Sequence, residues 1–248
     1  MRITAKDNVD QFLDQLDANL IKRLPIAIAI ALTKTANLVQ AEERAEMERV
    51  FDRPTPYTLG SVMVAPATKD KLEASVWLKD DDRGGGSHPA TEYLVPHIDG
   101  GARVEKRSEF ILRSTGILPT GMIAVPGQAA RLDAYGNISR GQVQQILSGL
   151  RVSETVAGHT SDRPFDKRRQ RKGLAQFFVA SRFGRARHLH PGVWERTGAT
   201  VRPILMFVRG ARYTKRLDFH GVAERIADAE LPRLLRIEID KTVQRVAR

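Results

Sequence analysis

Apolar positions recur every three or four residues along the first fifty residues, with polar positions between them. Residues 7–24 place Val9, Phe12, Leu13, Leu16 and Leu20 on one face, which predicts an amphipathic helix. Pro25 is expected to end that helix or to start the next one. The following stretch, up to Phe51, is rich in alanine and has a charged opposite face. It predicts a second helix that ends before the Pro54–Thr55–Pro56 turn.

The pattern then changes from a period of three or four to a period of two. Residues 59–65 are rich in β-forming types, and residues 72–79 alternate between apolar and polar side chains. We expect an antiparallel pair of strands that is joined around residues 66–70.

A region of different composition separates this pair of strands from the last third of the chain. Residues 80–86 hold three aspartates and three glycines and predict a polar loop. Short helices are expected over residues 89–98 and 103–113, and irregular structure over residues 116–136. Ser139 is expected to cap a helix that runs to Leu150. Residues 151–172 are polar and basic and predict a long loop.

The last third returns to strands and then to helix. Residues 176–181, 192–196 and 204–208 predict three short strands, and the last of these has the unbroken apolar run of a buried strand. Helix is expected from Asp218, with a break at Pro232 that leaves a basic amphipathic terminal helix.

This order predicts an α+β fold. Long N-terminal and C-terminal helices would pack on a small, mostly antiparallel sheet, with a mixed insertion. Residues 1–80 and 175–248 would form the core domain, and residues 81–174 the insertion, with short helices and loops.

Charge is distributed unevenly along the chain. Residues 1–162 hold 19 lysines and arginines against 21 acidic residues, whereas residues 163–248 hold 21 against 8. The basic charge of segment 163–187 indicates contact with a polyanion or with an acidic partner. The alternative is that these side chains form an ordinary basic surface exposed to solvent. The segment's nine basic residues are Arg163, Lys167, Arg168, Arg169, Arg171, Lys172, Arg182, Arg185 and Arg187.

Candidate chemistry is sparse. The chain has no cysteine, which excludes thiolate metal sites, cysteine nucleophiles and disulfides. Asp80–Asp81–Asp82 lacks the spacing of a calcium loop, and Gly84–Gly85–Gly86 lacks the lysine of a phosphate loop. His188 and His190 would share a face in a strand, but no carboxylate partner lies nearby in sequence; His220 is the third candidate. We therefore expect no catalytic residue, no metal and no cofactor.

The N-terminus has no signal-peptide pattern, and the apolar run 26–32 is too short to cross a bilayer. No membrane association is expected.

Three short motifs stand near the ends of the chain: residues 31–36 (ALTKTA), residues 47–58 (MERVFDRPTPYT) and residues 190–196 (HPGVWER). They resemble segments of the family of tailed-phage minor tail protein Z and head–tail joining (tail completion) proteins. The resemblance covers the two ends of the chain, about half of it, while residues 81–174 depart from the compact members. It implies structural roles for Pro191, Gly192, Val193, Trp194, Arg196, Phe207 and Tyr213.

The same resemblance implies a non-enzymatic virion protein of the neck or tail that acts by ring assembly. Its partners would be further copies of itself and the portal, adaptor or tail proteins, with DNA in the channel as a further candidate. It would reside in the virion, and in the host cytoplasm during assembly. The alternative is a nucleic-acid-binding protein that uses the basic segment 163–187. A nuclease ranks third, because no clustered acidic ligands are evident.

Overall fold

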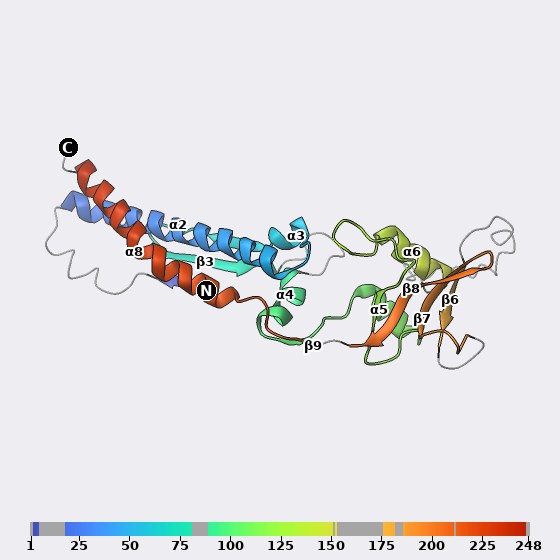
Figure 1. Ribbon diagram of the computed structural model, residues 1–248. Coiled ribbons are helices and arrows are strands. Elements are labelled where there is room, and N and C mark those ends of the chain that lie inside the picture. Colours follow the sequence, from blue (N-terminus) through green and yellow to red (C-terminus); the bar gives the residue numbers. More distant parts are fainter. Residues whose placement is uncertain are drawn as a thin grey trace, which may run out of the picture. The chain divides into compact units, whose positions relative to one another are not determined.

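The chain folds into two compact units. The computed structural model describes residues 2–4, 18–80, 89–150, 152, 176–181, 186–210 and 212–246. Unit 1 comprises Met1–Gly101 and Thr214–Arg248, and unit 2 comprises Ala102–Tyr213. Unit 1 is therefore built from both ends of the chain, and unit 2 is inserted between them (Figure 1).

Two long helices, α2 (Ala18–Val50) and α8 (Phe219–Val246), lie side by side in unit 1 (Figure 1). They run antiparallel, because Lys34 of α2 pairs with Glu238 of α8 at 2.7 Å, while the carbonyl of Val50 accepts a hydrogen bond from Arg216 at 2.9 Å. Glu238 is buried and also pairs with Lys241 at 2.9 Å. Hydrogen bonds from these two lysines lower the pKa of Glu238.

The sheet of unit 1 consists of β1 (Arg2–Thr4), β3 (Glu73–Leu78) and β2 (Val62–Ala65), in the order β1-β3-β2 and antiparallel throughout. Helix α2 covers one face of it. Gln40 donates to the carbonyl of Val62 at 2.6 Å, and Thr33 accepts from the amide of Ala67 at 3.1 Å. Two short helices, α3 (Pro56–Leu59) and α4 (Ala90–Ile98), complete the unit.

The core of unit 1 lies between the helices and this sheet. Its fully or nearly buried side chains are apolar and come from α2, the sheet, α4 and the start of α8; they include Leu32, Val39, Met47, Val62, Val76, Leu94, Leu217 and Phe219.

Pro25 and Pro232 lie inside the long helices, so the predicted breaks at these positions are wrong. Each proline removes one backbone donor and frees the carbonyl four residues earlier. Those carbonyls belong to Ile21 and Asp228, which are exposed, so water can satisfy them. Packing of the neighbouring leucines in the helix interface maintains the helix on both sides.

Among the residues that the structure describes, unit 2 has a four-stranded antiparallel sheet and the helices α5 (Arg107–Ser114) and α6 (Arg140–Gly149). Its strands are β5 (Met122–Pro126), β8 (Thr200–Arg209), β7 (Gly192–Thr197) and β6 (Gln176–Ala180), in that order. The two helices supply Leu112, Ile146 and Leu147 to its core. The strands supply Val193, Ile204, Leu205 and Phe207.

A two-stranded sheet, β4 (Gly101–Ala102) with β9 (Arg212–Tyr213), forms where the chain passes from one unit to the other. It brings the outgoing and returning segments together.

The α+β fold with long terminal helices on a small antiparallel sheet is confirmed. Ser139 caps α6 as predicted, by accepting from the amide of Gln142. The expected domain boundaries at residues 80 and 175 are corrected to 101/102 and 213/214. The cause is β5, which lies in the stretch 116–136 that was predicted to be irregular. Because β5 pairs with β8, it belongs to one sheet with β6, β7 and β8, and this sheet lies in unit 2. The predicted helix 7–24 lies outside the described residues up to position 17.

Gly192 is required by the close approach of β7 to β8. A Cβ atom at this position would overlap the carbonyl oxygen of Leu205, which belongs to the backbone and cannot rotate away. We predict that Gly192→Ala destabilises unit 2 by about 3 kcal/mol. Urea unfolding in a Trp77→Phe background measures this, because Trp194 is then the only tryptophan in the chain and lies in unit 2.

Gly141→Ala is the matched control for this substitution. A Cβ at Gly141 meets nothing within 4 Å, so we expect no loss of stability in unit 2. Equal unfolding midpoints for the two variants would contradict the steric account of Gly192.

Candidate functional site

Unit 2 carries the positive charge of the protein. It has 20 lysines and arginines against 7 acidic residues, whereas unit 1 has 20 against 22. Eight of the nine predicted contact residues, Arg163 to Arg185, lie outside the described residues. Arg187 is exposed in the turn that precedes β7. The structure therefore assigns the charge asymmetry to one folded unit.

Most of the motif residues occupy structural positions in the sheet of unit 2. Gly192 and Val193 are buried opposite Met206 and Leu205 of β8, and the amide of Phe207 donates to the carbonyl of Pro191 at 3.0 Å. Phe207 itself belongs to the core. The remaining motif residues are Trp194, Arg196 and Tyr213.

Trp194 and Arg196 lie on the other face of β7. The indole of Trp194 donates to the carbonyl of His190 at 3.0 Å, and the guanidinium of Arg196 lies 5.5 Å from the ring centre of Phe178. Tyr213 lies in β9, apart from this sheet. The structure brings six of the seven motif residues together and gives them packing roles.

The two phenylalanines that follow the basic segment point to opposite faces of β6. Phe177 packs against the core of unit 2, and its ring lies against Gly149 of α6. Phe178 contacts Arg196 instead. One of the two is therefore a core residue, as the strand pattern predicts, and the other is available at the surface beside an arginine.

The histidines form no common site. His188 and His190 are exposed in the turn before β7 rather than in a strand, so the predicted shared face is wrong. His220 belongs to unit 1, at the start of α8. Asp80 accepts a hydrogen bond from Thr91, while Asp81, Asp82 and the glycine run lie outside the described residues. Among the residues that the structure describes, no group of three or more histidine, aspartate or glutamate side chains could hold a metal ion.

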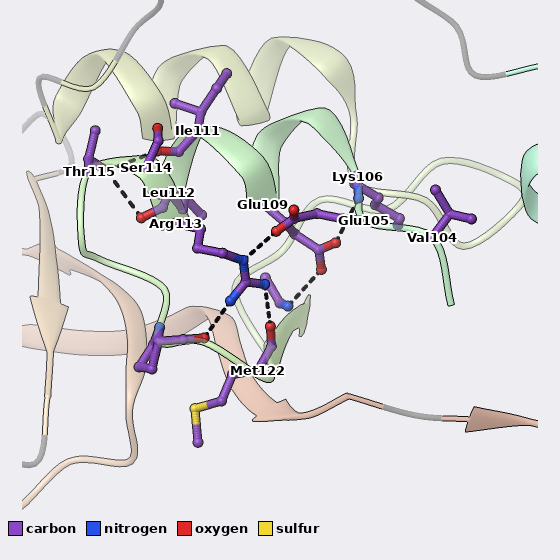
Figure 2. Close-up of polar contacts among 12 residues, drawn as sticks. Val104, Glu105, Lys106, Glu109, Ile111, Leu112, Arg113, Ser114, Thr115 and Met122 are labelled. Carbon is purple, nitrogen blue, oxygen red and sulfur yellow. Dashed lines mark hydrogen bonds and ion pairs between the residues drawn. The ribbon is translucent and has the colours of Figure 1, made fainter. Parts of the chain in front are cut away.

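The most organised polar cluster lies around α5 of unit 2 (Figure 2). The carboxylate of Glu109 is buried and accepts from the backbone amides of Lys106 at 2.9 Å and Ala124 at 2.8 Å, and it pairs with Arg103. It therefore connects the start of α5 to strand β5. Both of its oxygens accept hydrogen bonds from the protein itself.

Arg113 extends the same cluster toward the loop after α5, as Figure 2 shows. Its guanidinium donates to Glu105 at 2.6 Å and to the carbonyls of Pro119 and Met122 at 2.6 and 2.7 Å. These contacts fix the chain between α5 and β5. Glu109 and Arg113 both hold segments of the backbone in place, so their charges have a structural role.

A cavity of about 210 Å³ lies beside Glu109, lined mainly by apolar residues of α5, α6 and β5. It is smaller than the ~300–1,000 Å³ of ordinary ligand sites. Both oxygens of Glu109 already accept hydrogen bonds from the protein, and most of the remaining lining is apolar.

Glu43 of α2 is the most unusual titratable group in the described part of the chain. It is fully buried, and neither of its carboxyl oxygens has a hydrogen-bond partner among the described residues. Burial, with the nearby charges of Glu46, Asp218 and Glu42, raises its pKa to about 8, against the opposing effect of Arg225. Glu43 is therefore largely protonated at neutral pH.

The sequence analysis missed the burial of Glu43 and Glu109, although a signal existed for one of them. Glu43 lies four residues from Val39 and four from Met47, both of which are fully buried, so helical periodicity places it on the core face. Glu109 had no such signal, because its burial depends on β5, which was not predicted.

By length and composition, α2 contains a window apolar enough to cross a membrane, but half of that window is buried inside unit 1. This is weak evidence, since the core helix of a soluble protein meets the same criteria.

Comparison of the chain with protein-family models, with curated proteins and with solved structures finds no match.

Proposed function

We propose that this chain is a non-enzymatic structural protein of a tailed-phage virion that acts at the neck or tail by ring assembly. The observation that carries the proposal is two pairs of exposed apolar side chains on unit 1, one on α2 and one on the sheet. Ile26 and Ile30 of α2 are 47% and 39% exposed, and Met63 and Trp77, which face each other across β2 and β3, are 38% and 42% exposed. Apolar side chains grouped in this way are typical of surfaces that another protein covers.

Two further observations agree with this function. Of the three segments that carry the resemblance to tail completion proteins, residues 31–36 form a mostly buried part of α2, and residues 190–196 include the buried start of β7. Residues 47–58 run from the end of α2 through α3, and only Met47 among them is buried. In addition, each organised charge cluster among the described residues holds backbone or another helix, and none presents a nucleophile beside a base.

Ring assembly requires that each copy contacts the next one through two different faces. A heterologous contact repeated by rotation closes into a ring. Unit 1 offers such faces, because the exposed side of α2 and the outer face of the sheet are distinct surfaces.

Mass spectrometry of purified virions tests this proposal. We expect the chain as a constant component of particles from the phage or induced prophage that encodes it, at several copies per particle. Absence from washed particles, with other tail proteins detected, would contradict a virion role.

The second candidate is nucleic-acid binding, which the charge of unit 2 favours. If the basic segment 163–187 contacts phosphates, DNA retention by the purified chain falls with salt, with a log–log slope of about 0.9 for each phosphate contacted. Neutralising Lys167, Arg168, Arg169, Arg171 and Lys172 would then flatten that slope. Retention that is independent of salt would exclude this candidate.

A further inference from the structure

The sheet of unit 2 has two chemically different faces. On one face, Phe177 and Val179 of β6 and Val193 of β7 pack in the core together with α5 and α6. Side chains alternate along a strand, so Phe178 and Trp194 lie on the opposite face. Neither of them belongs to the core, and each is half-buried. We name this side of the sheet the aromatic face.

The two rings of the aromatic face are neighbours and are held in place. Phe178 of β6 and Trp194 of β7 are directly opposite each other in the antiparallel pair. The indole of Trp194 donates to the carbonyl of His190 at 3.0 Å, and the guanidinium of Arg196 lies 5.5 Å from the ring centre of Phe178. The aromatic face therefore presents two adjacent rings with an arginine beside them.

The charge around these rings is positive. Glu195 is the only acidic residue in β5, β6, β7 and β8, and alternation directs it away from the aromatic face. Phe178 itself lies within the basic segment 163–187, with six lysines and arginines before it and three after it. Unit 2 as a whole has 20 basic residues against 7 acidic ones. The aromatic face thus combines flat rings with charge that suits a polyanion.

We infer that the aromatic face of unit 2 binds single-stranded nucleic acid, with unpaired bases stacked on Phe178 and Trp194 and with Arg196 and the basic segment against the phosphates. Rings on a sheet face stack bases only when these are free of a duplex, and a basic surroundings follows the backbone of the strand. An acidic protein surface would satisfy the charge, but its carboxylates offer no flat ring to the two aromatic side chains.

This inference goes beyond the virion role and does not depend on it. It adds base contacts to the phosphate contacts of the second candidate function. The two kinds of contact are distinguishable, because stacking does not release counterions whereas each phosphate contact does.

Binding of a fluorescent oligothymidylate to the full-length chain, followed by fluorescence anisotropy over a range of salt concentrations, tests the inference. The variants Phe178→Leu and Trp194→Leu keep apolar bulk in the sheet but remove a ring. We expect each to bind at least about fivefold more weakly than the unmodified chain. The log–log salt slope should stay the same in both, because no phosphate contact is lost.

Phe110→Leu is the matched control, because Phe110 is an exposed phenylalanine of the same unit on α5, 61% exposed. It should bind like the unmodified chain. Trp194→Phe keeps a ring and should restore most of the affinity that Trp194→Leu loses. An abasic strand of the same length, and a duplex that contains the same strand, should both bind more weakly than the oligothymidylate.

Four outcomes would overturn the inference. These are no binding of the oligothymidylate, equal affinity for the abasic strand, equal affinity for the duplex, or leucine variants that bind like Phe110→Leu. Polyglutamate that binds as tightly as the oligothymidylate would assign the aromatic face to an acidic protein instead. Each result is independent of the virion experiment, since a chain absent from particles can still bind single strands and a chain present in them can fail these tests.

Discussion

A chain in which Glu109 is replaced by alanine is expected to lose about 3–5 kcal/mol of stability in unit 2. The substitution removes the partner of Arg103, whose side chain is only 14% exposed, and leaves the amides of Lys106 and Ala124 without an acceptor. Loss of a buried charge partner is costly because the remaining charge stays desolvated. Urea unfolding in the Trp77→Phe background, with Trp194 as reporter of unit 2, measures the effect.

Glu105→Ala provides the comparison on the same side of α5. Glu105 also pairs with an arginine, Arg113 at 2.6 Å, but about a third of each side chain is exposed. Arg113 keeps its two carbonyl acceptors in this variant. We expect a loss of at most about 1 kcal/mol. If the two variants unfold at the same urea concentration, Glu109 does not connect α5 to β5 in the way described.

Unit 1 is expected to become less stable as the pH rises from 5 to 8, because of Glu43. Its pKa is raised to about 8 in the folded chain, against 4.5 for an ordinary glutamate. Between these values the folded state holds a proton that the unfolded state has released, so the contribution of Glu43 falls by up to about 1.4 kcal/mol per pH unit. Glu43→Gln cannot ionise and should therefore raise stability at pH 8 by roughly 2–4 kcal/mol, with little change at pH 5.

The measurement is unfolding in a Trp194→Phe background, in which Trp77 reports on unit 1. Glu48→Gln is the matched control, because Glu48 lies on the same helix but is exposed. It should leave the pH dependence unchanged. A pH profile of Glu43→Gln that parallels the unmodified chain would show that Glu43 is ionised and solvated in the folded state.

The helical pattern predicted the architecture of unit 1 because its period is strong and local. The helix predicted up to Phe51 corresponds to α2, whose buried positions Leu32, Val39 and Met47 follow the helical period, and the alternation in residues 72–79 corresponds to β3. The breaks predicted at Pro25 and Pro232 were wrong. Proline disfavours the interior of a helix, but here tertiary packing on both sides of each residue maintains the helix. The antiparallel partnership of α2 with α8 connects residues about 200 positions apart, which periodicity alone cannot determine.

Unit 2 was harder to predict for a physical reason. Strand β5 is short, lies in a stretch rich in glycine and proline, and is defined by its pairing with β8 some 80 residues later. Without it, the burial of Glu109 and the correct domain boundary could not be inferred. The charge asymmetry, in contrast, was visible in the composition. The structure refined it by assigning the excess to unit 2.

The structural role that we propose is tested most directly by a cryo-EM map of the neck and tail of tailed-phage particles produced by cells that encode this chain. We expect density for the α2–α8 pair on a three-stranded sheet, repeated by rotation about the tail axis. A neck and tail that are fully accounted for by other proteins would contradict it.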